Sequence, residues 1–459
     1  MREYVKQHKF WLVIFIVIFL INQLPFIADV RPFLYDEAWY TNTAYNFSQG
    51  NGFLNSVVGS GGNANCLLPM ITGTLFRIFG YSLFTIRLTA VICGVITILF
   101  IHLCLKEWKC SVKSEIAVLA FLVSITLFNT IFRTGRPECV SLMCMSGGVW
   151  FLLRYIRNMS WGNMIGLAIF TFVSTLAHPY ALLFYALAGL ALLIITIKDK
   201  NWMNFAHLSL LLLTAICAIG TMTYIDHTYN EMGGYNMFDR FSLGNIVSAL
   251  PIYIKGCFLS KHTLYMVPLL GITLLSCWSK ERSIKVLAYI TFSYFILFPF
   301  LFSTDLMMIG LGLEYVAFLA TLLVAPSAEY VDQFHFKKAI WSLFAMYCIL
   351  NVGISYYFNY TKKFEQCNTL LRKEIRAIIP TDAVVFASIR QYPLIMENTC
   401  FSDHYRGTLP DSFDYIVVNS SDAYKYDISE DVLQSIDDYT LIYERDTKQY
   451  GAVSVYKHK

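Results

Sequence analysis

The sequence contains little charge for its length. Only 14% of its 459 residues are Asp, Glu, Lys or Arg, whereas a soluble domain carries about 25%. The net charge is +4 and no run of basic residues stands out, so the sequence does not predict binding to nucleic acid. Hydrophobic residues make up 56% of the chain. This composition is typical of a polytopic membrane protein.

The sequence also lacks closely spaced cysteine pairs and internal repeats, although Cys367 and Cys400 in the C-terminal region could pair. Its 12 cysteines are scattered, mostly inside apolar runs, and no C-x-x-C pair occurs. Cysteines in such places are usually small hydrophobic core residues, so their spacing predicts neither a zinc site nor a disulfide framework.

About eleven apolar runs are long enough to cross roughly 30 Å of hydrocarbon as helices. They lie at 10–28, 84–105, 115–132, 139–156, 161–177, 181–197, 204–224, 264–278, 287–303, 306–325 and 339–357. No small-residue cleavage site follows the first run, so we interpret it as an uncleaved helix. Because every second short loop is rich in Lys and Arg, we expect a cytoplasmic N-terminus and an extracytoplasmic C-terminal segment.

Two polar segments interrupt this pattern of apolar runs. The last run ends at 357, so we divide the chain into a membrane domain at 1–357 and a small domain at 358–459. The first polar segment is a loop at 29–82, which we expect to be helical and to lie on the membrane surface. The second is the C-terminal domain, where a helical period at 362–379 precedes strand-like runs. These runs lie at 383–387, 415–418, 440–443 and 452–456, and they predict an extracytoplasmic α/β fold.

Two adjacent carboxylates, Asp36 and Glu37, begin the informative part of this loop. Charges at the membrane edge are costly to desolvate and need a physical reason. One reason is helix capping, because acidic residues are favourable in the first turn of a helix. The other is a catalytic role, and the residues around the pair help to decide between capping and catalysis. The segments that follow the pair are Ala38-Trp39-Tyr40, Gly50-Asn51-Gly52, Pro69 and Gly80-Tyr81-Ser82-Leu83-Phe84-Thr85-Ile86-Arg87.

The order and spacing of these segments resemble the first loop of the GT-C membrane glycosyltransferases. The branch includes protein O-mannosyltransferases and lipid A aminoarabinose transferases. Arg133-Thr134-Gly135-Arg136-Pro137-Glu138 and Ala177-His178-Pro179-Tyr180 resemble two further external elements of these proteins. Relatives often place a basic residue before a tyrosine near the tenth span. Here Glu314 precedes Tyr315, so the resemblance assigns no carrier-phosphate contact to that place.

The resemblance implies a donor sugar on a polyprenyl phosphate and transfer with inversion. An acceptor hydroxyl needs a general base, which we assign to Asp36, with Glu37 orienting the site or binding the acceptor. Arg136, Arg133 and Arg87 are the candidates for binding the donor phosphate, because a guanidinium pairs well with phosphate oxygens. Glu138 is expected to hold one of these arginines or to bind a sugar hydroxyl.

Each candidate has a structural alternative. Arg87 and Arg133 could extend from helix ends to the interface, and Arg136 could form only an ion pair with Glu138. His178 before Pro179 could be a turn residue. Trp39 and Tyr40 could stack on a sugar or anchor their helix at the interface.

The resemblance implies a bacterial inner membrane, a lipid, glycan or protein acceptor, and neither a cofactor nor a bound metal, although two adjacent carboxylates could bind a divalent metal ion. A transporter or flippase for a lipid-linked or small polar solute is the main alternative function. It predicts charges in mid-helix, broken helices and a repeat. A scaffold or sensor is a further alternative, but it would not need both motifs on one side of the membrane.

Overall fold

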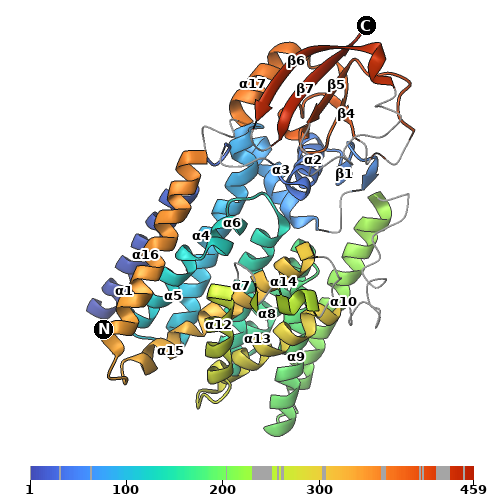
Figure 1. The fold of residues 1–459 in the computed structure, drawn as a ribbon. Coiled ribbons are helices and arrows are strands. Elements are labelled where there is room, and N and C mark those ends of the chain that lie inside the picture. Colours follow the sequence, from blue (N-terminus) through green and yellow to red (C-terminus); the bar gives the residue numbers. More distant parts are fainter. Residues whose placement is uncertain are drawn as a thin grey trace.

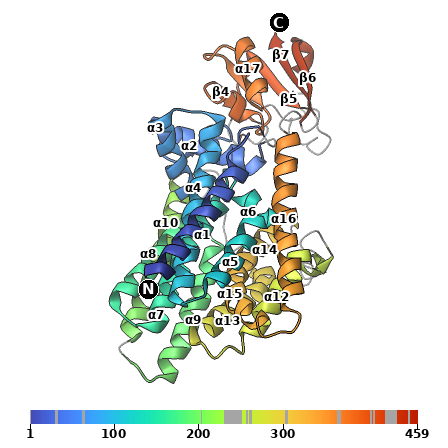
Figure 2. The ribbon, with the colours of Figure 1, turned by 90° about the vertical axis from the view of Figure 1, so that its left-hand side faces the viewer.

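A helical bundle with a small sheet domain at one end makes up the computed structural model of this chain (Figure 1). The structure describes residues 2–29, 33–61, 65–202, 204–229, 251–255, 258–259, 263–301, 306–362, 368–402, 405, 408–419, 435–447 and 450–459. The N-terminal end of the first helix lies away from the sheet domain (Figures 1 and 2).

Apolar helices form the bundle, and their buried faces share one large hydrophobic core. They are α1 (Arg2–Gln23), α4 (Leu83–Glu107), α5 (Val112–Ser124), α6 (Thr126–Ile131), α7 (Pro137–Arg157), α8 (Trp161–Ala177), α9 (Ala181–Lys198), α10 (Asn204–Tyr229), α12 (Thr263–Ser276), α13 (Arg282–Leu301), α14 (Leu306–Leu322), α15 (Val324–Val331) and α16 (Lys337–Lys362). The last of these extends to Lys362, beyond the predicted domain boundary at 357.

A helix occupies each predicted span, but the number of spans is not confirmed. Within the described ranges, five helices are long and apolar enough to cross a membrane, and a pair bent by 45° at α14 and α15 would make a sixth. Other apolar helices are shorter, and the run predicted at 115–132 breaks at Ile125, which is extended between α5 and α6. The chain is a multi-pass membrane protein whose helices are less regular than the hydropathy pattern predicts.

The loop predicted at 29–82 folds into two helices and a short hairpin. Here α2 (Tyr35–Gln49) packs on α3 (Leu67–Phe79), while β1 (Leu54–Asn55) pairs antiparallel with β2 (Ser60–Gly61).

Close packing between α2 and α3 depends on a glycine. A Cβ added to Gly73 would lie 2.5 Å from the Ala44 carbonyl oxygen, closer than side chains tolerate. On its other side, α3 leaves Ile78 and Phe79 largely exposed. Such an apolar face suits a helix at a membrane surface, and that location stays a prediction.

The C-terminal domain contains a mixed five-stranded sheet covered by one helix. The strands are β3 (Val384–Ala387), β4 (Thr399–Phe401), β5 (Tyr415–Asn419), β6 (Tyr439–Thr447) and β7 (Gly451–His458), in the order β4-β3-β5-β7-β6. The helix α17 (Asn368–Ile378) buries Leu371 and Ile375 in the same core as Val385 and Val417. Phe386, between two residues that face the helix, packs on the opposite face, as the two-residue period of a strand requires.

This domain is fixed to the first loop by specific hydrogen bonds. The phenol of Tyr450 accepts the Phe33 N–H at 2.8 Å and donates to Asn368 at 3.1 Å. Tyr81 donates to the Pro393 carbonyl at 2.6 Å. Since Phe33 lies just before α2, the domain holds the helix on which the two predicted catalytic carboxylates lie.

Candidate active site

Asp36 and Glu37 lie in the first turn of α2. Backbone N–H groups of a first turn have no partner inside the helix, so carboxylates are favourable there. Leu34, the residue before the helix, donates its N–H to Glu37 Oε2 at 3.4 Å. Glu37 therefore contributes to the cap. Adjacent helical residues do not share a face, so the Asp36 side chain points in a different direction.

Glu37 is held by Arg87 from the first turns of α4. Arg87 donates from Nε to Oε1 at 2.7 Å and from Nη2 to Oε2 at 3.0 Å, which makes a bidentate pair. Both side chains are 0% exposed. Arg87 Nη1 donates to the Ile27 carbonyl at 2.8 Å, and the guanidinium carbon lies 4.5 Å from the centre of the Phe33 ring. This geometry favours a structural role for Arg87 over the predicted contact with a donor phosphate.

The segment between α6 and α7 lies against the start of α2. The Gly135 N–H donates to Glu37 Oε1 at 3.1 Å, across 98 positions of the sequence. A Cβ on Gly135 would lie 3.2 Å from the Ile86 carbonyl oxygen, so a larger residue would crowd this junction. Pro137 begins α7, where a proline loses no intrahelical hydrogen bond. The two motifs found in the sequence thus meet in one place.

Arg136 connects the two motifs because its side chain lies between the carboxylates of Asp36 and Glu138. Its Nη2 lies 3.2 Å from Asp36 Oδ2 and 2.9 Å from Glu138 Oε1, and its side chain is 15% exposed. Within the described part of the chain, Arg136 Nε and Glu138 Oε2 are buried without a hydrogen-bond partner. Buried polar atoms without partners are rare in folded proteins. Both atoms therefore keep an unused capacity for a hydrogen bond close to Asp36.

Asp36 is the member of the carboxylate pair that a substrate can reach. Its side chain is 31% exposed, whereas that of Glu37 is 0% exposed. The protein around the carboxyl group raises the pKa of Asp36 above its ordinary value by desolvation, and the charge of Glu138 adds to this. The charges of Arg136 and Arg390 act in the opposite direction. A raised pKa makes the carboxylate a stronger base near neutral pH.

Arg133 lies at the end of the first helix. It donates to the carbonyl oxygens of Asn22 at 2.8 Å and Pro25 at 2.6 Å, and its side chain is buried. Carbonyl groups at a helix C-terminus lack intrahelical partners, and a basic side chain can satisfy them. These bonds favour the helix-end alternative for Arg133 over phosphate binding.

His178 follows α8 and is buried near Arg136. Burial, together with the charge of Arg136, lowers the pKa of His178 to about 3. The ring is therefore neutral at physiological pH, and its Nδ1 accepts the N–H of Tyr180 at 3.2 Å. A neutral side chain that accepts a hydrogen bond from its own turn fits the turn role.

The two aromatic candidates on α2 differ in their partners. Asn65 donates to the phenol of Tyr40 at 2.6 Å, and this tyrosine is buried. Trp39 is half-buried and packs against the core of the bundle. The structure thus places Tyr40 in the protein interior, where it interacts electrostatically with Arg136.

The charged cluster around Asp36 and Arg136 includes two further residues that the sequence did not assign to the site. Glu314, on α14, interacts electrostatically with Arg136 and Glu138. Arg390, which follows β3 in the C-terminal domain, interacts with Asp36. Glu314 did have a signal in the sequence, since it is a charged residue inside an apolar run. Arg390 had none, because nothing in the sequence pairs the C-terminal domain with the start of α2.

Among the residues that the structure describes, no three His, Cys, Asp or Glu side chains are grouped to hold a metal ion. Metal independence was implied only by the resemblance, and it stays a prediction.

Proteins of known structure have a similar fold. ArnT from Cupriavidus metallidurans bound to undecaprenyl phosphate superposes with a TM-score of 0.64 at 12% identity, covering 97% of this chain and 98% of that chain. Its apo state gives 0.64 at 11% identity over 98% of each chain. The arabinofuranosyltransferase AftD from mycobacteria gives 0.51 at 11% identity, covering 98% of this chain and 41% of that chain.

In sequence, residues 66–224 match the family described as dolichyl-phosphate-mannose-protein mannosyltransferase. No protein of curated function matches the chain. The matched segment contains Arg87 and the Arg133–Glu138 motif, and it begins after Asp36 and Glu37.

Proposed function

We propose, on the premise that this chain is a multi-pass membrane protein with the fold of the GT-C glycosyltransferases, that it transfers a sugar from a polyprenyl-phosphate donor. The observation that carries this proposal is the pairing of Asp36 with Arg136 where the two motifs meet. A partly exposed carboxylate beside a guanidinium supplies a base for the acceptor and a cation for the phosphate. The superposition with ArnT bound to undecaprenyl phosphate supports a polyprenyl carrier.

In the proposed reaction, the acceptor oxygen attacks the anomeric carbon from the face opposite the phosphate. The bond between the anomeric carbon and the phosphate oxygen breaks, and the acceptor proton moves to Asp36. The polyprenyl phosphate leaves with its added negative charge, which Arg136 stabilises through its remaining N–H groups. The configuration at the anomeric carbon is inverted.

The other charged residues have supporting roles in this proposal. Glu37 and Arg87 fix the start of α2 and so the position of Asp36. Glu138 holds Arg136 through its Oε1. Arg390, which is also buried, supplies a second positive charge near Asp36, whereas Arg87 and Arg133 are bound to other groups.

The side of the membrane and the acceptor class also belong to the proposal. The basic loops of the sequence support a cytoplasmic N-terminus, which puts the site and the C-terminal domain on the extracytoplasmic side. An acceptor there would be a lipid, a glycan or a protein. The resemblance supports a bacterial inner membrane as the setting.

The test is transfer by the purified full-length protein in liposomes. Undecaprenyl-phosphate donors carrying labelled mannose, arabinose or aminoarabinose would be incubated with membrane lipids, cell-wall saccharides or serine-rich peptides. We expect release of polyprenyl phosphate together with label covalently attached to an acceptor. Movement of intact donor or of free solute across the bilayer, without release of polyprenyl phosphate, would instead establish the transporter alternative.

A further inference from the structure

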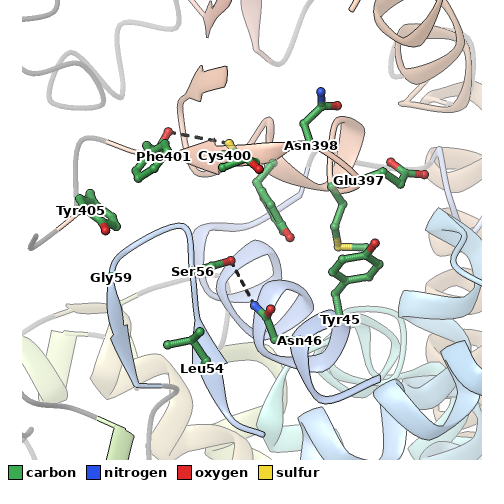
Figure 3. Close-up of a pocket in the computed structure, with 13 residues that line it drawn as sticks. Tyr45, Asn46, Leu54, Ser56, Gly59, Glu397, Asn398, Cys400, Phe401 and Tyr405 are labelled. Carbon is green, nitrogen blue, oxygen red and sulfur yellow. Dashed lines mark hydrogen bonds between the residues drawn. The ribbon is translucent and has the colours of Figure 1, made fainter. Parts of the chain in front are cut away.

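A cavity of about 540 Å³ separates the first loop from the C-terminal domain (Figure 3). The α2 helix and the β1–β2 hairpin form one wall. Residues between η2 (Tyr392–Leu394) and Phe401, together with Tyr405, form the other. The volume lies within the range of about 300–1,000 Å³ that is usual for small-molecule sites.

This cavity is distinct from the proposed reaction centre. Asp36, Arg136 and Glu138 do not line it, whereas Tyr45 does. Tyr45 follows Asp36 on α2 by about two and a half helical turns, which places the two residues on opposite faces and about 14 Å apart along the axis. A ligand in the cavity therefore does not contact the general base directly.

The walls of the cavity are held rigid by their own hydrogen bonds. Asn46 Nδ2 donates to Ser56 Oγ at 3.1 Å, which ties α2 to the hairpin. Asn398 Nδ2 donates to the carbonyl oxygens of Pro380 at 2.6 Å and Ala383 at 3.1 Å. The two amides thus shape the cavity instead of facing a ligand.

The groups that remain for a ligand are hydroxyls and one carboxylate oxygen. In the part of the chain that the structure describes, the hydroxyls of Tyr45, Tyr405 and Thr399 make no hydrogen bond to protein. Glu397 accepts a bond from Arg372 through Oε1, while its Oε2 has no partner there. These hydroxyls can donate or accept, and the carboxylate oxygen accepts.

Aromatic rings complete this lining. The rings of Phe401 and Tyr405 pack edge to face at 4.9 Å at one end of the cavity, and Tyr45 lies at the other end (Figure 3). Gly59 allows Tyr405 to approach the hairpin, because a Cβ there would lie 2.6 Å from the tyrosine ring and the φ angle of +61° favours glycine.

We propose that this cavity binds a neutral saccharide, as the part of a glycan-bearing acceptor that lies away from the reacting hydroxyl. Aromatic faces attract the C–H surfaces of a sugar ring, and the free hydroxyls and the carboxylate oxygen match its hydroxyl groups. No Lys, Arg or His is among the described residues of the lining, so an anionic ligand would meet no positive charge in the lining, and Arg372 outside it is already paired with Glu397. The inference rests on the proposed transferase function for its biological role, but binding can be measured without transfer.

The test is saccharide binding to the full-length protein in nanodiscs, followed by saturation-transfer NMR. The probes are mannose, galactose, N-acetylglucosamine and their di- and trisaccharides, with glucuronate, inorganic phosphate and a serine- and threonine-rich peptide as competitors. We expect a neutral saccharide to bind, Tyr405→Ala to weaken binding at least about tenfold, and Thr399→Val or Tyr45→Phe to weaken it less. Tyr330→Ala is the matched control, because it removes an exposed tyrosine of α15 at the other end of the molecule.

The outcomes separate this inference from the proposed function. Saccharide binding that the cavity variants weaken and Asp36→Asn leaves intact supports the inference, even in a protein that shows no transfer. No saccharide binding, binding unchanged in all three cavity variants, or preferred binding of phosphate, glucuronate or peptide overturns it, even if transfer occurs. Thermal unfolding checks that each variant is folded, and Tyr45→Phe, which removes only one hydroxyl, keeps the test valid if Tyr405→Ala fails to fold.

Discussion

The buried pair of Glu37 and Arg87 gives a prediction about stability that is separate from catalysis. Both side chains are 0% exposed and share two hydrogen bonds at 2.7 and 3.0 Å. Removing one partner leaves the other as an uncompensated buried charge, which costs about 3–5 kcal/mol of unfolding free energy. Arg87→Met and Glu37→Leu should therefore each destabilise the protein by about this amount.

The double variant decides whether the pair acts as a unit. Because neither buried charge remains when both are replaced, Arg87→Met with Glu37→Leu should lose less than the sum of the single losses, by about 0.5–3 kcal/mol. Arg87→Lys keeps the positive charge but lacks the planar guanidinium, so its unfolding free energy should lie between those of wild type and Arg87→Met. Unfolding of each purified variant in mixed micelles, followed by circular dichroism during a denaturant titration, measures these differences.

The assignment of Arg87 would be refuted by a particular result. If Arg87→Met unfolds like wild type but no longer binds the polyprenyl-phosphate donor, Arg87 contacts the donor phosphate and does not hold Glu37. Additive losses in the double variant would likewise show that the two side chains do not stabilise each other.

Further predictions concern the reaction centre. The base must be deprotonated, so kcat/KM should fall as the pH drops through an apparent pKa that lies above the usual value for aspartate; a profile that stays flat down to pH 4 would contradict the raised pKa of Asp36. Because the charge of Arg390 lowers the pKa of Asp36, Arg390→Gln should move this acid limb to higher pH. A limb that stays in place or moves to lower pH in the same pH–rate measurement would rule out this electrostatic interaction. Chelation of divalent ions with EDTA should leave the initial rate of transfer unchanged, whereas a loss that Mg²⁺ or Mn²⁺ restores would show a metal requirement.

The sequence predicted the general architecture well, because it rests on strong local patterns. The fold class, a helical membrane domain with a small α/β domain, is confirmed by the superposition with ArnT over nearly the whole of both chains. The predicted runs at 383–387, 415–418, 440–443 and 452–456 overlap strands of the C-terminal sheet. The strand Thr399–Phe401 was missed, because three residues are too few to show an alternating pattern.

Span boundaries were harder to predict, because hydropathy does not report where a helix bends. Ile125 is as apolar as its neighbours, yet it is extended and separates α5 from α6. Leu323 lies between α14 and α15 and is equally inconspicuous in the sequence. Tertiary packing decides such breaks, so composition alone predicts one continuous run.

The candidate site was located by its motifs, but the partners of its side chains depend on the fold. The sequence identified three arginines as candidates for binding the donor phosphate and could not distinguish between them. Only the structure shows Arg136 beside Asp36, with Arg87 on Glu37 and Arg133 on the end of α1. Arg390 reaches the site only because the C-terminal domain docks on the first loop, and no local pattern predicts that contact.

The most direct test of the account compares transfer by wild type, Asp36→Asn and Asp382→Asn in detergent with a polyprenyl-phosphate donor. Asp382 is an exposed acid of the C-terminal domain and serves as the matched control. The account predicts that Asp36→Asn, while folded like wild type, loses at least about a hundredfold in kcat, as expected for the loss of a general base, and that Asp382→Asn stays active. Transfer by Asp36→Asn at the wild-type rate would contradict the central claim that this carboxylate activates the acceptor.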